Sequence, residues 1–249
     1  MDDVSSKNTR PKKVPKRSVK KFGARRVLIW LLIVLLCLTV VPVALLRFVP
    51  AWTSSFMLQY QVLRVFSEAE KPALQHRWIE WEKISPAAKL AVIAAEDQRF
   101  ADHFGVDFKA LGKAIKHNRT NHRTRGASTI TQQTAKNLFL WPRRSWFRKG
   151  LELGYTLLIE LAWSKQRVLE VYLNIVEFGP GVYGVEAASQ TYFAKSADKL
   201  TYHEAALLAA VLPNPKRFKV AAPSLYVQNR AIWIRKQMNQ IGVQQLGEL

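Results

Sequence analysis

The strongest constraint on the fold is a run of twenty uncharged residues, VLIWLLIVLLCLTVVPVALL, at positions 27–46. A helix that rises about 1.5 Å per residue would span roughly 30 Å over this run, which matches the hydrocarbon core of a bilayer. Pro42 does not exclude such a helix, because membrane-spanning helices tolerate proline. The run is longer than the apolar part of a cleaved signal peptide, and no A-x-A-like cleavage site follows it. We therefore predict an uncleaved transmembrane helix at 27–46.

The segment before this run, residues 1–26, is strongly basic. It holds ten lysines and arginines against Asp2 and Asp3. Such a segment buries too little apolar surface to fold, so we predict a disordered tail. Basic residues that flank a span stay in the cytoplasm, which predicts export of everything after residue 46. A nucleic-acid-binding tail is the alternative, but a basic run next to a span is more simply a topology signal.

The exported part remains basic, with 28 lysines and arginines against 16 acidic residues, a net charge of +12. A basic domain held at a membrane favours anionic headgroups or a phosphorylated substrate. After a membrane-proximal segment at 47–74, the sequence predicts an α-rich domain over 75–249. FGPGVYG, residues 178–184, is interpreted as a loop.

Capping residues and apolar spacing predict the helices of this domain. Ser85 and Pro86 begin one helix, Ser128 caps another over 128–140, and Thr201 and Glu204 have capping-box spacing. The remaining helices are expected at 107–118, 145–162, 164–173 and 223–242.

Acidic residues are concentrated in AAEDQRFADHFGVD, residues 94–107. Glu96 falls at the C-terminal end of the predicted helix, where the helix dipole disfavours negative charge. A carboxylate made more basic in this way suits a general base. For Asp102 and Asp107 the simpler role is to cap turns around Gly105, and for His103 it is to hydrogen-bond a loop backbone.

A second polar group lies in TRGASTITQQTAKN, residues 124–137. Ser128, Gln132 and Lys136 share one helical face, and Arg144 lies a short loop away. This pattern suits an anion-binding site, with a solvated helix face as the alternative.

A third group lies in RSWFRKGLELG, residues 144–154, where Glu152 can pair with both Arg148 and Lys149. It is either a surface ion pair or a second functional acid tuned by cations.

Two segments, 51–66 and 138–147, are unusually apolar for connections. The second interleaves leucine, phenylalanine and tryptophan with Arg143 and Arg144. Both segments suit either core packing or contact with a bilayer interface, and the interface is favoured for 138–147.

Five motifs in order resemble the family 51 peptidoglycan glycosyltransferases: EDQRFADHFGVD, RGASTITQQTAKN, RKGLE, RVLEVYLNIVEFGPGVYGVEAAS and HEAALLAAVLPNP. The resemblance covers about residues 75–240. The short chain and single span are similar to the monofunctional biosynthetic transglycosylases, since no room remains for the transpeptidase domain of bifunctional penicillin-binding proteins. This resemblance implies a mainly α, lysozyme-like domain of two lobes behind the transmembrane helix.

The resemblance also implies a reaction, the polymerisation of lipid II into β-1,4-linked glycan with inversion and release of undecaprenyl pyrophosphate. Glu96 then resembles the general base, and Glu152 the second essential acid. Lys136 and Arg144 resemble the cations that stabilise the pyrophosphate. The remaining substrate contacts would be Ser128, Gln132, Gln133, Arg148 and Lys149.

The same resemblance implies lipid II, the nascent glycan strand and membrane lipid as partners. It allows proteins of cell-wall synthesis or division, and it leaves nucleic acid out. No cofactor is obligatory, although a divalent cation, Mg²⁺ or Mn²⁺, could sit at the pyrophosphate. The implied location is the bacterial cytoplasmic membrane, with an extracytoplasmic catalytic domain.

Two rival functions remain at this point. A lysozyme-like hydrolase or lytic transglycosylase would share the carboxylate chemistry but would have no need for the Lys136 and Arg144 pair. A non-enzymatic scaffold would not depend on Glu96.

Overall fold

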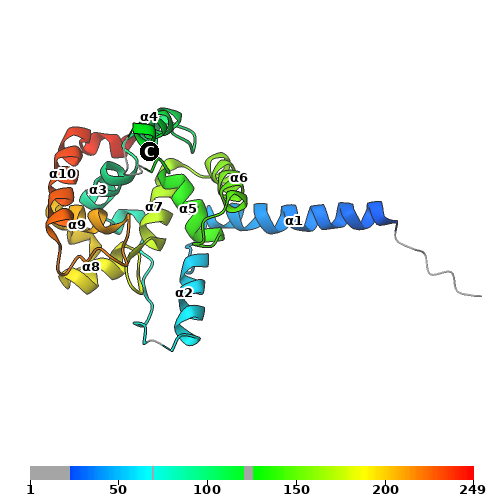
Figure 1. Ribbon diagram of the computed structural model, residues 1–249, viewed down its shortest axis with the longest axis horizontal. Coiled ribbons are helices and arrows are strands. Elements are labelled where there is room, and N and C mark those ends of the chain that lie inside the picture. Colours follow the sequence, from blue (N-terminus) through cyan, green and yellow to red (C-terminus); the bar gives the residue numbers. More distant parts are fainter. Residues whose placement is uncertain (1–22, 69, 121–125) are drawn as a thin grey trace, which may run out of the picture. The chain divides into compact units, whose positions relative to one another are not determined.

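The computed structural model describes residues 23–68, 70–120 and 126–249. Its contacts divide the chain into two compact units, residues 1–38 and 39–249. Secondary structure is mainly helical, as predicted (Figure 1). Residues 1–22 of the predicted basic tail lie outside the described residues, and residues 24–26 already belong to a helix.

The N-terminal helix α1 runs from Ala24 to Leu46 and contains the predicted apolar run. Within the described ranges it is the one helix long and apolar enough to cross a membrane. Its large side chains from Val27 to Leu38 are exposed, so protein does not cover them. An apolar helix without protein cover is consistent with a membrane anchor.

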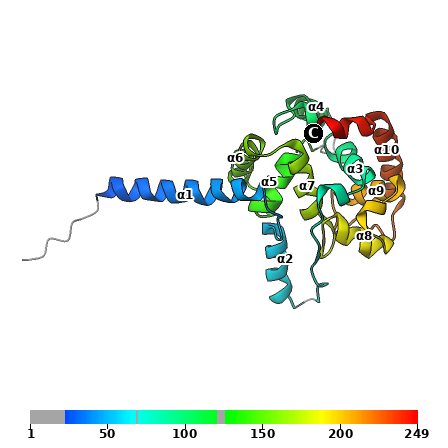
Figure 2. The same ribbon diagram turned by 180° about the vertical axis from the view of Figure 1, so that it is seen from behind.

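Residues 39–249 contain two groups of packed helices, visible in Figures 1 and 2. The first group is α3 (Pro86–Glu96), α9 (Tyr202–Val211) and α10 (Leu225–Ile241). The second group is α2 (Ser55–Val65), α5 (Ile130–Phe139), α6 (Trp146–Ala162) and α7 (Lys165–Ile175). The other elements are α4 (Phe108–Thr120), α8 (Val185–Phe193) and the 3₁₀ turns η1 (Trp81–Lys83), η2 (Phe100–Asp102), η3 (Ala197–Lys199) and η4 (Val243–Glu248).

Side-chain caps fix where these helices begin. The Ser85 hydroxyl accepts from the Ala88 amide, and Thr201 and Glu204 form the predicted capping box. The prediction that Ser128 caps α5 is wrong by one residue, because Thr129 and Gln132 form the capping box there. Threonine is a somewhat weaker N-cap than serine, but the capping box also needs a glutamine or glutamate three residues later, which Thr129 has and Ser128 lacks.

A small sheet joins β1 (Gln75–His76), β2 (Glu177–Gly179) and β3 (Val182–Tyr183) in the order β1-β3-β2. The interpretation of 178–184 as a loop is therefore wrong in part, since β2 and β3 form an antiparallel hairpin. Strands of two or three residues are too short to show alternation in a sequence. The turn between them relies on Gly181, whose φ of +79° favours glycine.

Helix α3 lies at the centre of the packing. Leu90 and Ile93 are fully buried, and each such side chain contributes about 1.5–3 kcal/mol of hydrophobic stabilisation. Its C-terminal residue, Glu96, accepts a hydrogen bond from Gln133 of α5. Glu96 therefore lies where the two groups of helices meet.

The last turns of α1 belong to the folded domain. Val43 is buried in the hydrophobic core, and its carbonyl accepts a hydrogen bond of 2.8 Å from the Trp163 indole. The Arg167 guanidinium donates to the carbonyls of Leu46 and Val49. These contacts tie residues 43–49 to the start of α7.

Candidate active site

A cavity of about 730 Å³ opens beside α5 and the N-terminal half of α6. Eight of the predicted site residues line it: Ser128, Gln132, Gln133, Lys136, Arg144, Arg148, Lys149 and Glu152. The helical spacing predicted this grouping on α5, because Ile130, Thr134 and Leu138 fill the core on the opposite side. Four of the lining side chains are cationic, so the cavity suits an anion.

Glu96 is not among the described residues that line this cavity, but it is hydrogen-bonded to Gln133, which does line it. Its Oε2 atom accepts a hydrogen bond of 2.6 Å from Gln133 Nε2. Gln133 is itself oriented by Tyr172, whose hydroxyl donates to Gln133 Oε1 over 3.0 Å. The other carboxylate oxygen, Glu96 Oε1, is buried and finds no hydrogen-bond partner among residues 23–68, 70–120 and 126–249. That oxygen therefore has unused capacity to accept a hydrogen bond.

The surroundings of Glu96 make it more basic than a solvated glutamate. Burial raises the pKa of its carboxyl group, and the hydrogen bond from Gln133 and the charges of Arg230 and Lys136 only partly oppose this. A raised pKa brings a carboxylate closer to the value that a general base needs near neutral pH. The structure thus gives Glu96 the environment predicted for it, with burial as the largest cause.

Lys136 is the cation between the cavity and Glu96. Burial lowers the pKa of its ammonium group, while the carboxylates of Glu152 and Glu96 act to raise it. Its Nζ atom lies 5.7 Å from the centre of the Phe56 ring, a contact that helps to hold the ammonium in place. A partly desolvated cation interacts more strongly with an incoming anion than a solvated one does.

Glu152 is buried, with 3% of its surface exposed, and forms ion pairs with Arg148 at 2.6 Å and with Lys149. The interpretation of these residues as a surface ion pair is therefore wrong. One carboxylate with two cations leaves a net positive charge in the cavity wall. Glu152 holds these cations in place, since a buried carboxylate needs partners of opposite charge.

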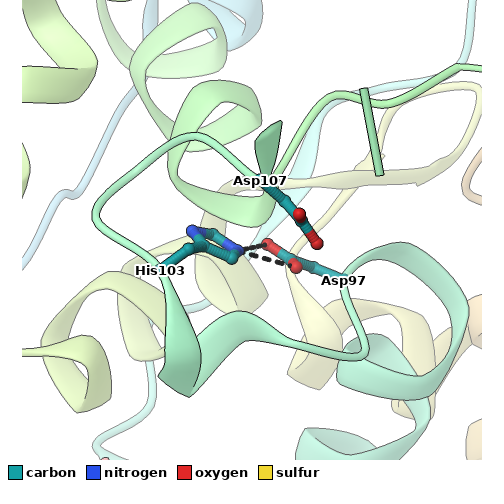
Figure 3. A group of neighbouring side chains, drawn as sticks. All are labelled: Asp97, His103 and Asp107. Carbon is teal, nitrogen blue, oxygen red and sulfur yellow. Dashed lines mark hydrogen bonds and ion pairs between the residues drawn. The ribbon is translucent and has the colours of Figure 1, made fainter. Parts of the chain in front are cut away.

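Asp97 and His103 form a buried pair next to Glu96 (Figure 3). His103 Nε2 lies 2.9 Å from Asp97 Oδ1, and Asp97 Oδ2 accepts from the backbone amide of Ile130 at the start of α5. The prediction that His103 bonds a loop backbone is wrong, because its ring nitrogen faces this carboxylate. Together the two contacts fasten the end of α3, with Glu96, to the beginning of α5.

Asp107 completes the cluster in Figure 3. It accepts from the Ala110 amide at 2.9 Å and from Arg99 at 3.1 Å, which confirms its predicted role as a cap. Gly105, two residues earlier, has a φ of +72°, and a side chain there would strike Thr156. Ligand atoms of Asp97, His103 and Asp107 lie within 4.8 Å of one another, but both carboxylates already accept from protein donors and His103 Nε2 is paired with Asp97. We interpret the cluster as a structural brace.

The described lining residues of the cavity offer few strong ligands for a divalent cation. Such an ion prefers several oxygen ligands, and Glu152 is the one carboxylate among the described lining residues. Glu152 is already bound by Arg148 and Lys149. Binding of Mg²⁺ or Mn²⁺ at the pyrophosphate stays a prediction, and the pyrophosphate oxygens would then supply the ligands.

Some residues around the site were not predicted. Phe56 of α2, Pro142 and Trp146 line the cavity, and Arg230 of α10 lies beside Glu96. Phe56, Pro142 and Trp146 lie in the apolar segments 51–66 and 138–147, but the sequence did not single them out as individual cavity residues. No local sequence pattern marks Arg230. It lies 135 residues after Ala95, the residue before Glu96, to whose carbonyl it donates.

A family model described as Transglycosylase matches residues 62–239, most of the chain. Three relatives carry the name "Biosynthetic peptidoglycan transglycosylase". The one from Aeromonas hydrophila is 55% identical over 215 residues, which are 85% of this chain and 89% of the relative. The one from Shewanella oneidensis is 54% identical over 226 residues, covering 88% and 94% of the two chains. The one from Escherichia coli is 55% identical over 219 residues, covering 88% and 90%.

Proposed function

The chain belongs to the transglycosylase family and is a peptidoglycan glycosyltransferase that polymerises glycan strands from lipid II, and we propose that Glu96 is its general base. In this mechanism Glu96 removes the proton from the 4-hydroxyl of the acceptor sugar. The oxygen attacks the anomeric carbon of the donor, the bond from that carbon to the phosphate oxygen breaks, and undecaprenyl pyrophosphate leaves. The configuration inverts because attack and departure take place on opposite faces.

The cationic wall of the cavity takes the leaving group. Negative charge develops on the pyrophosphate as the bond breaks, and fixed cations in a partly desolvated site stabilise such charge most strongly. We assign this role to Lys136 and Arg144, with Arg148 and Lys149 completing the wall. Glu152 acts on the reaction through Arg148 and Lys149, which it orients.

One observation carries this proposal: Gln133 links the cationic cavity directly to the carboxylate of Glu96. Gln133 lines the cavity and donates to Glu96. A pyrophosphate on the cations and an acceptor hydroxyl on the base would then lie on either side of the same side chain. A hydrolase acting on finished glycan has no leaving group that needs four cations.

An assay with two substrates separates the transferase from the hydrolase. The full chain is incubated with lipid II and, separately, with finished uncrosslinked glycan. We expect lipid II to be consumed with release of undecaprenyl pyrophosphate and with a product that a muramidase digests, while the finished glycan keeps its length. Shortening of the glycan with no consumption of lipid II would contradict the proposal.

We propose that the N-terminus is cytoplasmic and the domain extracytoplasmic, as the basic residues before α1 favour. The domain then lies at the outer surface of the membrane, where its lipid-linked substrate is found. Proteins of cell-wall synthesis or division are its expected neighbours there.

We further propose that the outer face of α6 contacts the bilayer. Leu153, Leu157 and Leu161 recur every fourth residue and are exposed, and Trp146 and Phe147 begin the same helix in solvent. A row of exposed leucines is costly in water and stable in acyl chains. The interface predicted for 138–147 is thus limited to its last residues, because Leu138 and Leu140 are buried and Phe139 stacks on Tyr155.

Spin labels test this contact in the full chain. Cys37, the only cysteine, is replaced by serine, and a label is placed at Leu161→Cys or, as a matched control, at Leu225→Cys. The two leucines are 74% and 72% exposed, on α6 and α10. In proteoliposomes we expect the label at 161 to be relaxed by oxygen and protected from a water-soluble nickel complex, and the label at 225 to show the reverse. Equal access of the nickel complex to both labels would contradict bilayer contact.

A further inference from the structure

Arg230 of α10 reaches the end of the helix that carries Glu96. Its Nη2 atom donates to the Ala95 carbonyl over 3.3 Å. Ala95 is in the last turn of α3, where backbone carbonyls have no partner within the helix. A cation there is favoured by both the free carbonyl and the helix dipole.

Two further contacts hold this arginine and its helix in place. The guanidinium carbon lies 5.9 Å from the centre of the Trp233 ring, one turn further along α10. Gln98, just beyond α3, donates to Gln237 of α10 over 3.0 Å. Helices α3 and α10 are packed side by side, as Figures 1 and 2 show, so Arg230 approaches Glu96 from a rigid element.

The guanidinium has bonding capacity left over. Arg230 Nε is buried and has no hydrogen-bond partner in the described part of the chain. Glu96 Oε1 is also buried and unpartnered there. Burying an unpaired donor or an unpaired carboxylate oxygen costs free energy. This cost is reduced when a buried cation and a buried carboxylate lie on neighbouring helices, because their charges balance.

Four charged or titratable groups face the Glu96 carboxylate. Arg230 comes from α10, Lys136 from α5 and Tyr172 from α7, and Asp97 is the next residue in the chain. Burial raises the pKa of Glu96. The positive charges of Arg230 and Lys136 lower this pKa, and the negative charge of Asp97 raises it further. Of the two cations, Arg230 has the larger effect and is absent from the lining of the cavity.

We propose that Arg230 is a positioning residue for the transfer reaction, in which its guanidinium, fixed on the Ala95 carbonyl, keeps Glu96 ionised and ready to accept a proton. This inference rests on the proposed role of Glu96 as the base. The two cations then have different roles: Lys136 stabilises the departing pyrophosphate, and Arg230, on α10, stabilises the ionised carboxylate.

The test is the pH dependence of kcat/KM for lipid II polymerisation by the full chain. Arg230→Gln removes the charge but keeps a donor for the Ala95 carbonyl, and Arg230→Lys keeps the charge. Arg235→Gln makes the same change at an exposed position of the same helix. We expect the acidic limb of Arg230→Gln to move to higher pH, so that its rate at pH 6 relative to pH 8 falls about five- to tenfold. The limbs of Arg230→Lys and Arg235→Gln should stay near that of the wild type.

Two outcomes overturn the inference. One is a folded Arg230→Gln enzyme whose acidic limb coincides with that of the wild type, and the other is an equal displacement in Arg235→Gln. Glu96→Gln in the same assay tests the underlying function separately. If Glu96→Gln polymerises lipid II normally, the proposed base is wrong; if it is inactive while Arg230→Gln keeps the wild-type limb, only the role of Arg230 fails.

A second measurement needs no arginine variant and remains decisive if Arg230→Gln does not fold. In full-length protein labelled with ¹⁵N-arginine, the Nε resonance of Arg230 should shift with pH at the midpoint of the acidic limb, because it senses the charge on Glu96. In Glu96→Gln that shift should be absent. The inference is contradicted if the Arg230 Nε chemical shift does not change with pH in the wild type. It is also contradicted if this shift changes equally in the wild type and in Glu96→Gln.

Discussion

Replacing Glu96 with glutamine is expected to abolish lipid II polymerisation while leaving the fold intact. The amide keeps the size of the side chain and can still accept from Gln133, but it cannot take the proton of the acceptor hydroxyl. General-base catalysis contributes about 10²–10⁴-fold, so kcat should fall by that factor. The measurement is the initial rate of glycan formation from labelled lipid II.

The same variant should melt at a temperature equal to or above that of the wild type at pH 8. Burial raises the pKa of Glu96 in the folded state, so the ionised carboxylate destabilises the fold above that pKa. The penalty vanishes as the pH falls below the pKa of the unfolded chain, and the difference in melting temperature should vanish with it. Asp102→Asn, an exposed acid of the same motif, is the control and should keep both activity and melting temperature. Loss of folding in Glu96→Gln, or full activity, would contradict the assignment.

Removing a cation from the cavity should have the next largest effect. Lys136→Met and Arg144→Met each delete one positive charge that we place on the departing pyrophosphate. Loss of one fixed group that stabilises transition-state charge costs about 10²–10³-fold in rate. Because the charge is greatest in the transition state, kcat should fall more than KM rises.

Arg143 provides a matched control for this prediction. It is exposed, adjacent to Arg144 and absent from the described cavity lining, and its backbone carbonyl accepts a hydrogen bond from Arg148. Arg143→Met should therefore retain a rate close to that of the wild type. Equal losses in Arg143→Met and Arg144→Met would show that general positive charge, and not a placed cation, supports the reaction. Lys136→Arg, which keeps the charge, should recover part of the rate lost in Lys136→Met.

Local chemistry made much of the fold predictable. Serine and threonine caps, proline at the first helical turn and apolar spacing located most of the helices to within a few residues, although α2 and α8 were not predicted. The grouping of Ser128, Gln132 and Lys136 followed from helical geometry alone, and the structure places these side chains around one cavity. Their roles in the reaction remain predictions.

Contacts between distant segments could not be predicted. His103 could bond either the backbone or a carboxylate, and only the folded chain selects Asp97. Glu152 has the same spacing to Arg148 and Lys149 on a solvated helix as on a buried one, so the sequence could not reveal its burial. Arg230 acts through a helix that packs on α3 far along the chain, and no spacing rule links the two.

The packing of Val43 has a consequence for truncation of the chain after the apolar run. A protease that cut just after the apolar run would remove a core side chain and the carbonyls that receive Trp163 and Arg167. Loss of these contacts would destabilise the catalytic domain, so a fragment that begins after the apolar run should melt at a lower temperature than one that begins near Thr39.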